Sequence, residues 1–217
     1  MPYLPSVTRN LLLLSALFFL ASLALPRIGI DLFSLFALHF PATSLFLPWQ
    51  PLTYLFLHGS FSHLFFNMFA LYIFGRVLED RWGSKPFLLF YLLAGVGAAA
   101  TQILAWLASL YAFASAHGAS LSHLLAVDPS ISFLSAIGAS GSIFAILFAF
   151  ALTFPNAPLY IMFIPIPLKA KYVVAVYILI ELVAAFAHIQ GDLIAHFAHL
   201  GGILFAFLLL RLPPWKP

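Results

Sequence analysis

Residues 87–113 read FLLFYLLAGVGAAATQILAWLASLYAF, an apolar run without a single charged side chain. The run is longer than the roughly 20 residues that an α-helix needs to cross the hydrocarbon core of a bilayer. Because every backbone N–H and C=O group in lipid must be bonded within the protein, such a run predicts a transmembrane helix. We therefore place the chain among membrane proteins.

The rest of the chain has the same character. Hydrophobic residues make up 64% of the 217 positions and charged residues only 7%, which are too few charges to cover the water-facing surface of a globular domain. Five further apolar runs, each bounded by charge or proline, lie at 11–25, 64–74, 143–154, 172–187 and 194–210. We expect an all-α, polytopic bundle of six transmembrane helices that forms a single domain over residues 1–217.

Two details of these runs bear on the topology. The runs at 64–74 and 143–154 are shorter than a full span. The run at 11–25 is open to a second interpretation as a secretory signal peptide, because Arg9 precedes its leucine-rich core and residues 21–24 are rich in small side chains. The charge pattern favours a retained helix.

The positions of the basic residues predict the orientation of the chain in the membrane and argue against a nucleic-acid partner. A cytoplasmic N-terminus leaves only Arg27 on the external side, and the positive-inside rule favours that arrangement. The other basic residues then lie in the cytoplasm: Arg9, Arg76, Arg81, Lys85, Lys169, Lys171, Arg211 and Lys216. Because they are scattered at helix ends, the formal charge of +3 indicates no nucleic-acid partner. The absence of cysteine excludes disulfides, thiolate metal sites and a cysteine nucleophile.

The connections between the runs differ in character. The segment 26–60 carries aromatic residues and hardly any charge, so it should lie in the headgroup region of the bilayer. The segment 154–171 carries four prolines, which exclude a continuous helix and predict a cytoplasmic connection. The segment 114–135 is the second long external connection in the expected orientation.

Three polar clusters stand at the beginnings of predicted helices, where ionisable groups are costly and usually functional. The first contains His58, His63 and Asn67, the second contains Gly138, Ser140 and Gly141, and the third contains His196, His199 and Gly202. The runs at 64–74, 143–154 and 194–210 cross the membrane in the same direction in this topology. The three clusters therefore lie at similar depth and can meet.

The chemistry of these residues favours hydrolysis by a serine nucleophile. A serine hydroxyl needs a base, and His199 is placed to provide one to Ser140 because Gly202 allows close helix packing beside it. Ser140 at a helix start also offers backbone N–H groups to a developing oxyanion, and His63 and Asn67 can add donors. Phe144, one turn beyond Ser140, is placed to stack on the histidine.

No acidic residue stands near the motifs in sequence, since Glu181 lies within the run at 172–187 and Asp192 at a loop edge. We therefore expect a Ser140–His199 dyad without a third, acidic member.

Taken together, the clusters resemble the rhomboid family of intramembrane serine proteases. The family pattern is H-x4-H-x3-N, then G-x-S-G, then A-H-x-x-G, and the matching residues are His58, His63, Asn67, Gly138, Ser140, Gly141, Ala198, His199 and Gly202. The similarity extends to Trp49-Gln50, where the family often has Trp-Arg, and to Glu79–Gly83. Gln50 in place of arginine and Phe144 in place of the tyrosine of some members are the two departures.

The resemblance implies a function and roles for these residues. Ser140 would attack the scissile carbonyl, His199 would act as base and then as acid, and His63, Asn67 and the Ser140 amide would hold the oxyanion. His58 would support the cavity wall. The implied substrate is a transmembrane segment with a small residue before the scissile bond. The chain itself resembles the simple six-helix bacterial form of the family, which implies a location in the bacterial inner membrane. No cofactor is implied, and the oligomeric state is open.

Four other interpretations remain. Gly-Ala-Ser-Gly alone is a common helix-packing motif, and some rhomboid relatives are inactive binders, although these usually lack the serine or the histidine. A metal site could use His58, His63, His196 and His199, but the His-Glu-x-x-His signature is absent and no carboxylate or cysteine completes a set, so we expect no metal. Glu181 could belong to a transport relay, which loss of transport with intact proteolysis in Glu181→Gln would reveal.

Overall fold

A computed structural model of the chain describes residues 4–160, 166–187 and 195–217. Four apolar helical segments in these ranges are long enough to cross a membrane. They are α1 (Ser6–Ala24) with the turn η1 (Leu25–Ile28), the continuous segment α4 (Phe61–Ala70), η3 (Leu71–Gly75) and α5 (Arg76–Trp82), the long helix α6 (Ser84–Ala116), and α9 (Ala170–Ala187). Two shorter apolar helices are α8 (Ser140–Thr153) and α10 (His196–Leu209).

The helix bounds correct the prediction in two places. The run at 64–74 belongs to a helical segment that extends from Phe61 to Trp82, so the expectation of a short second helix is wrong. The charged residues that seemed to end it, Arg76 and Glu79, lie inside the helix, and Glu79 is buried with hydrogen-bond partners. The run at 194–210 forms a helix of only 14 residues. Asp192, at the loop edge before that run, lies outside the described residues.

The two long connections, 26–60 and 114–135, contain short elements that bind each other. The first carries α2 (Leu32–Phe36), β1 (Leu38–His39), α3 (Gln50–Thr53) and η2 (Tyr54–Phe56). The second carries α7 (Leu121–Val127), η4 (Pro129–Phe133) and β2 (Ser135–Ala136). β1 and β2 pair antiparallel, with Leu38 opposite Ala136. The helical bundle therefore includes a minimal two-stranded sheet beside the segment that leads to Ser140.

A second pair of two-residue strands closes the proline-rich connection. β3 (Pro158–Leu159) pairs antiparallel with β4 (Leu168–Lys169). The helix α8 ends at Thr153 and α9 begins at Ala170, so no helix continues across this segment, as the prolines predicted.

Gln50 anchors the first connection from the inside. Its side chain is fully buried, accepts a hydrogen bond from the His39 backbone N–H at 3.2 Å and donates to the carbonyl of Leu45 at 2.9 Å and of Ser34 at 3.4 Å. The neighbouring Trp49 donates its indole N–H to the Leu35 carbonyl at 2.9 Å. A neutral amide thus does the anchoring at the position where the resemblance leads one to expect an arginine.

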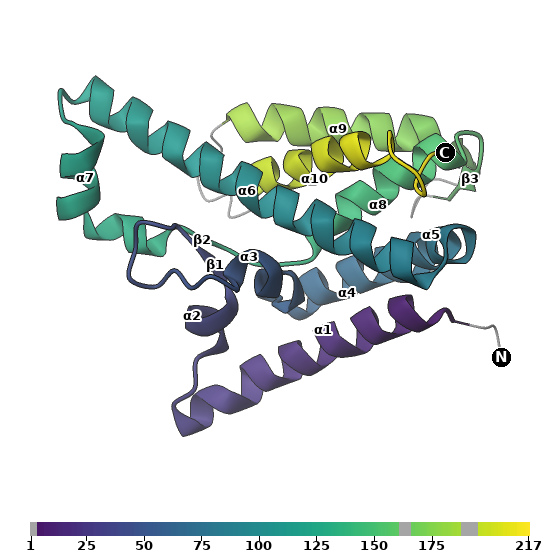
Figure 1. Cartoon of the computed structure of the whole chain (residues 1–217), viewed down its shortest axis with the longest axis horizontal. Coiled ribbons are helices and arrows are strands. Elements are labelled where there is room, and N and C mark those ends of the chain that lie inside the picture. Colours follow the sequence, from purple (N-terminus) through teal and green to yellow (C-terminus); the bar gives the residue numbers. More distant parts are fainter. Residues whose placement is uncertain (1–3, 161–165, 188–194) are drawn as a thin grey trace.

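Helix α6 runs through the centre of the molecule, as Figure 1 shows, with α8 and α10 packed against it and α1 at the periphery. Small residues on α6 permit this packing: a Cβ atom on Gly97 would lie 2.1 Å from the ring of Phe205 in α10. The core of the molecule therefore lies along α6, and both helices that carry Ser140 and His199 are docked on it.

Glu79 secures the N-terminal end of α1. Its carboxylate accepts hydrogen bonds from the backbone N–H groups of Val7 at 2.9 Å and Thr8 at 2.7 Å, and from the Ser84 hydroxyl at 2.6 Å. Because the first N–H groups of a helix have no acceptor within the helix, this carboxylate serves as a cap supplied from another span.

We expect Glu79→Gln to lower the free energy of unfolding by about 1.5–3 kcal/mol, since hydrogen bonds to a charged acceptor are lost or weakened at a buried site. Thermal unfolding of the protein in detergent measures the change. Asp80→Asn is the matched control, because Asp80 is exposed and should change the stability by less than about 0.5 kcal/mol. Equal shifts in both variants would contradict the capping role.

Candidate active site

Ser140 is the first residue of α8, and an irregular segment from β2 leads into it. Within that segment Gly138 has φ of +116°, a conformation that favours glycine, and its N–H donates to the Tyr54 carbonyl at 2.9 Å. A Cβ atom on Gly138 would lie 2.7 Å from the ring of His63. Glycine at this position therefore allows both the turn before Ser140 and the approach of His63.

Direct backbone contact brings α10 onto α8. A Cβ atom on Gly202 would lie 2.0 Å from the carbonyl oxygen of Gly141, and one on Gly141 would lie 2.5 Å from the Cβ of Ala98. A Cβ atom on the preceding glycine, Gly201, would lie 2.5 Å from the side chain of Thr101 in α6. Since no side chain separates the helices here, residues next to these glycines on α8 and α10 come within reach of each other.

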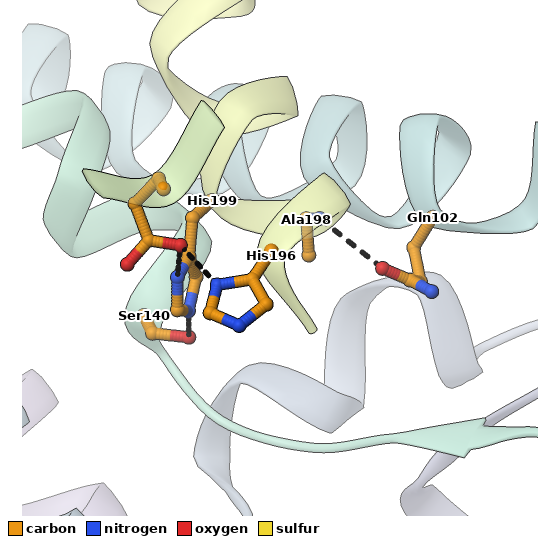
Figure 2. A network of polar contacts seen from close by, with 6 residues as sticks. Gln102, Ser140, His196, Ala198 and His199 are labelled. Carbon is orange, nitrogen blue, oxygen red and sulfur yellow. Dashed lines mark hydrogen bonds and ion pairs between the residues drawn. The ribbon is translucent and has the colours of Figure 1, made fainter. Parts of the chain in front are cut away.

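The hydroxyl of Ser140 and the imidazole of His199 lie in hydrogen-bonding contact. The distance from His199 Nε2 to Ser140 Oγ is 2.7 Å, and Figure 2 shows the two side chains facing each other from α8 and α10. The ring of Phe144 stacks on His199 with centroids 4.4 Å apart and planes inclined by 18°. The imidazole is therefore held between a hydroxyl at its edge and an aromatic ring on its face.

The expectation that no acid lies near the motifs is wrong. Glu181 in α9 accepts a hydrogen bond from His199 Nδ1, at 2.8 Å from its Oε2, on the side of the ring opposite Ser140. Glu181 and His199 are both buried, at 8% and 7% exposed. The contact joins two different helices, so spacing along the chain could not reveal it. One feature of the sequence did point to a contact of this kind: an acidic residue within an apolar run is costly in a membrane, so Glu181 needs a buried polar partner.

His196 shares the same carboxylate. Its Nδ1 lies 2.6 Å from Glu181 Oε2, so one oxygen accepts from both histidines. The argument that no carboxylate completes a set of metal ligands is therefore wrong as well, because ligand atoms of Glu181, His196 and His199 lie within 4.8 Å of one another. Two imidazoles and a carboxylate are suitable ligands for zinc. In the structure Nδ1 of each histidine is hydrogen-bonded to Glu181 Oε2.

The residues of the first cluster lie beside Ser140. His63 and Asn67 on α4 line the same cavity as Ser140 and His199. The Asn67 amide donates one hydrogen bond to the His63 carbonyl at 2.8 Å, which leaves its second N–H for another acceptor.

His58 lies in the loop before α4, with its ring 5.0 Å from that of His63. Burial and the neighbouring His63 lower the pKa of His58 to about 4, so its ring is neutral near pH 7. Its Nδ1 lies 3.3 Å from the Phe56 carbonyl, and its buried Nε2 has no partner among the residues described.

A cavity of about 1690 Å³ gives Ser140 and His199 access to the surroundings. Phe65 and Phe69 of α4 line one part of it, and Val174 and Tyr177 of α9 line another. The cavity is large enough for water and for a segment of polypeptide. The short, glycine-containing sequence of residues 188–192 suits a lid, but this segment lies outside the described residues.

These features define a helical membrane protein in which a serine and a histidine from two helices meet in a large cavity. A family model described as "Rhomboid domain" matches residues 47–213, which is most of the sequence. The chain belongs to the rhomboid family.

Similarity to individual relatives is confined to shorter stretches. Rhomboid protein 1 of Saccharomyces cerevisiae mitochondria is 30% identical over 112 residues, which are 52% of this chain and 27% of the relative. Rhomboid protease GluP of Bacillus subtilis is 41% identical over 71 residues, 33% of this chain and 13% of the relative. Rhomboid-like protease 3 of Toxoplasma gondii is 44% identical over 61 residues, 28% and 23% respectively. The chain thus matches less than a third of each relative's length.

The contact between Gly141 and Gly202 yields a test of the helix packing. We expect Gly202→Ala to lower the free energy of unfolding by about 1–3 kcal/mol. The added methyl group meets a backbone carbonyl that cannot move aside without separating the helices. Gly59→Ala is the control, since its Cβ would lie 3.3 Å from the end of the flexible Ile137 side chain. Thermal unfolding in detergent compares the two, and equal stability would contradict the close packing.

Proposed function

We propose that this rhomboid-family chain is an intramembrane serine endopeptidase that cleaves transmembrane segments of other proteins. The observation that carries the proposal is the 2.7 Å contact between Ser140 Oγ and His199 Nε2 at a cavity inside a helical membrane protein. Two of the relatives are named as proteases, which supports the same activity.

The proposed reaction proceeds through an acyl-enzyme. Ser140 Oγ attacks the scissile carbonyl while its proton passes to His199 Nε2, and the resulting imidazolium then protonates the leaving amine as the peptide bond breaks. Water, deprotonated by the neutral His199, next attacks the ester and releases the new carboxyl end with Ser140 restored. Each proton taken by the histidine is returned, so the enzyme is unchanged after one cycle.

The oxyanion of the tetrahedral intermediates needs donors that are already in place. The Ser140 backbone N–H lies in the first turn of α8, where N–H groups have no acceptor within the helix. His63 and the free N–H of Asn67 line the same cavity and are the proposed side-chain donors. His58 would support His63, while Gly138, Gly141, Phe144 and Gly202 would hold the serine and histidine in place.

The proposed substrate is a transmembrane helix that reaches the site from the lipid. A peptide bond in a helix is shielded by its own hydrogen bonds, so the substrate must unwind before Ser140 can attack. Glycine or proline near the cut would favour unwinding, and the resemblance implies a small residue before the scissile bond. The aromatic and aliphatic lining of the cavity suits an apolar polypeptide.

The proposed location is a bacterial inner membrane with the N-terminus in the cytoplasm. In this orientation Ser140 at the start of α8 lies toward the external side, and the β3–β4 connection with Lys169 lies in the cytoplasm.

Cleavage of a reporter transmembrane segment in liposomes tests the function. We expect wild type to cleave, and Ser140→Ala and His199→Ala to lower kcat/KM by at least about 10³-fold, because each removes an atom that takes part in bond making or proton transfer. Thermal unfolding of each variant is the control for folding. Cleavage by folded Ser140→Ala at the wild-type rate would refute the mechanism.

Labelling of introduced cysteines tests the orientation, and the natural sequence helps because it contains no cysteine. Ala116→Cys, at the end of α6, should react with a membrane-impermeant maleimide added outside intact cells. Asn156→Cys, between α8 and β3, should react only after the membrane is opened. Both positions are exposed in the structure. The reverse pattern would invert the proposed topology.

A further inference from the structure

Glu181 lies where it can control the protonation of His199. Its Oε2 is 2.8 Å from Nδ1, while Ser140 Oγ is 2.7 Å from Nε2, so the imidazole bridges a carboxylate and a hydroxyl. The three side chains come from three different helices, α9, α10 and α8. We propose that Glu181 is a positioning residue that completes a Ser140–His199–Glu181 triad, an inference that rests on the proposed protease function.

The contact with Glu181 selects the tautomer of His199. A neutral imidazole carries one N–H, and the hydrogen bond made by one nitrogen decides which nitrogen has it. An ionised carboxylate only accepts hydrogen bonds, so Glu181 requires the proton of His199 to be on Nδ1. Nε2 is then left with its lone pair toward Ser140. That is the tautomer that can take the serine proton.

Glu181 also compensates the charge that His199 gains during the reaction. When Nε2 accepts the proton from Ser140, His199 becomes an imidazolium in a site that is only 7% exposed. The carboxylate at 2.8 Å compensates this positive charge and remains ionised itself, since the proton on Nδ1 stays with the ring. The negative charge of Glu181 thus stabilises the state that forms during the reaction more than the resting state.

A second histidine holds the Glu181 carboxylate in its position. His196 Nδ1 lies 2.6 Å from the same Oε2, one helical turn before His199 on α10. Two histidines of one helix therefore fix the carboxylate of another. The rotamer of Glu181 and the plane of the His199 ring are determined together, with Phe144 stacked on the ring face.

Steady-state kinetics of Glu181→Gln, with reporter cleavage in liposomes, provide the test. Glutamine keeps the shape and can still hydrogen-bond, but it lacks the charge and can donate to Nδ1, which permits the wrong tautomer. We expect kcat to fall by about 10²–10⁴-fold with KM within about threefold, since the loss concerns the transition state. Labelling of Ser140 by a fluorophosphonate should slow in parallel. Glu181→Asp should recover at least tenfold in kcat over Glu181→Gln.

The matched control is Glu79→Gln, the same chemical change at another buried glutamate that caps α1. It should lower stability and leave kcat unchanged. If Glu181→Gln does not fold, the kcat of Glu181→Leu, which also lacks the carboxylate, decides, and a value within threefold of wild type overturns the triad.

The outcomes separate this inference from the function on which it rests. If wild type cleaves, Ser140→Ala does not, and Glu181→Gln retains kcat within threefold, the triad is wrong and the protease stands. If wild type does not cleave while Ser140 is unreactive to the fluorophosphonate, the protease itself is wrong. Stoichiometric zinc in purified wild type that Glu181→Gln lacks would identify the cluster as a metal site and overturn the triad.

Discussion

The backbone contact between Gly141 of α8 and Gly202 of α10 is the constraint on which the candidate site depends. In lipid the hydrophobic effect does not drive helices together, so close packing of small residues is a main source of their association. Ser140 precedes one of these glycines and His199 lies one turn before the other. The separation of the two helices at this point therefore decides whether the hydroxyl and the imidazole can meet.

Helix α6 provides the frame that keeps both helices in register. Its backbone carbonyls at Tyr91 and Gly95 accept hydrogen bonds from the hydroxyls of Ser142 and Tyr54, at 2.7 Å and 2.8 Å. Its Gln102 side chain accepts from the Ala198 N–H at 3.2 Å, the contact drawn in Figure 2. A buried hydroxyl or N–H without a partner is costly, so the bonds of Ser142, Ala198 and Tyr54 favour one position of α8, of α10 and of η2, respectively, along α6.

Helix α9 serves the site in two ways, because it lines the cavity with Val174 and Tyr177 and also holds Glu181 against His199. A displacement of α9 away from the bundle would widen the cavity and withdraw the carboxylate at the same time. The irregular backbone before Ser140 donates a hydrogen bond to Tyr54 and packs on His63, and its residues Gly138 and Ala139 are buried, as irregular backbone at membrane depth must be.

Apolar runs and motif spacing are local properties of the sequence, and they were enough to predict an all-α bundle and the serine, histidine and glycine clusters. Of the six expected transmembrane helices, four in the described residues are long enough to cross a membrane, and α8 and α10 are shorter. Periodicity also placed Phe144 over His199 correctly, one turn from Ser140. The assumption that charged residues end an apolar run failed for the segment Phe61–Trp82, because buried hydrogen bonds allow Glu79 to remain within the helix. Only the tertiary structure decided that Glu181 and His196 join His199, because a contact between helices depends on their relative rotation and depth, and spacing along one chain contains neither.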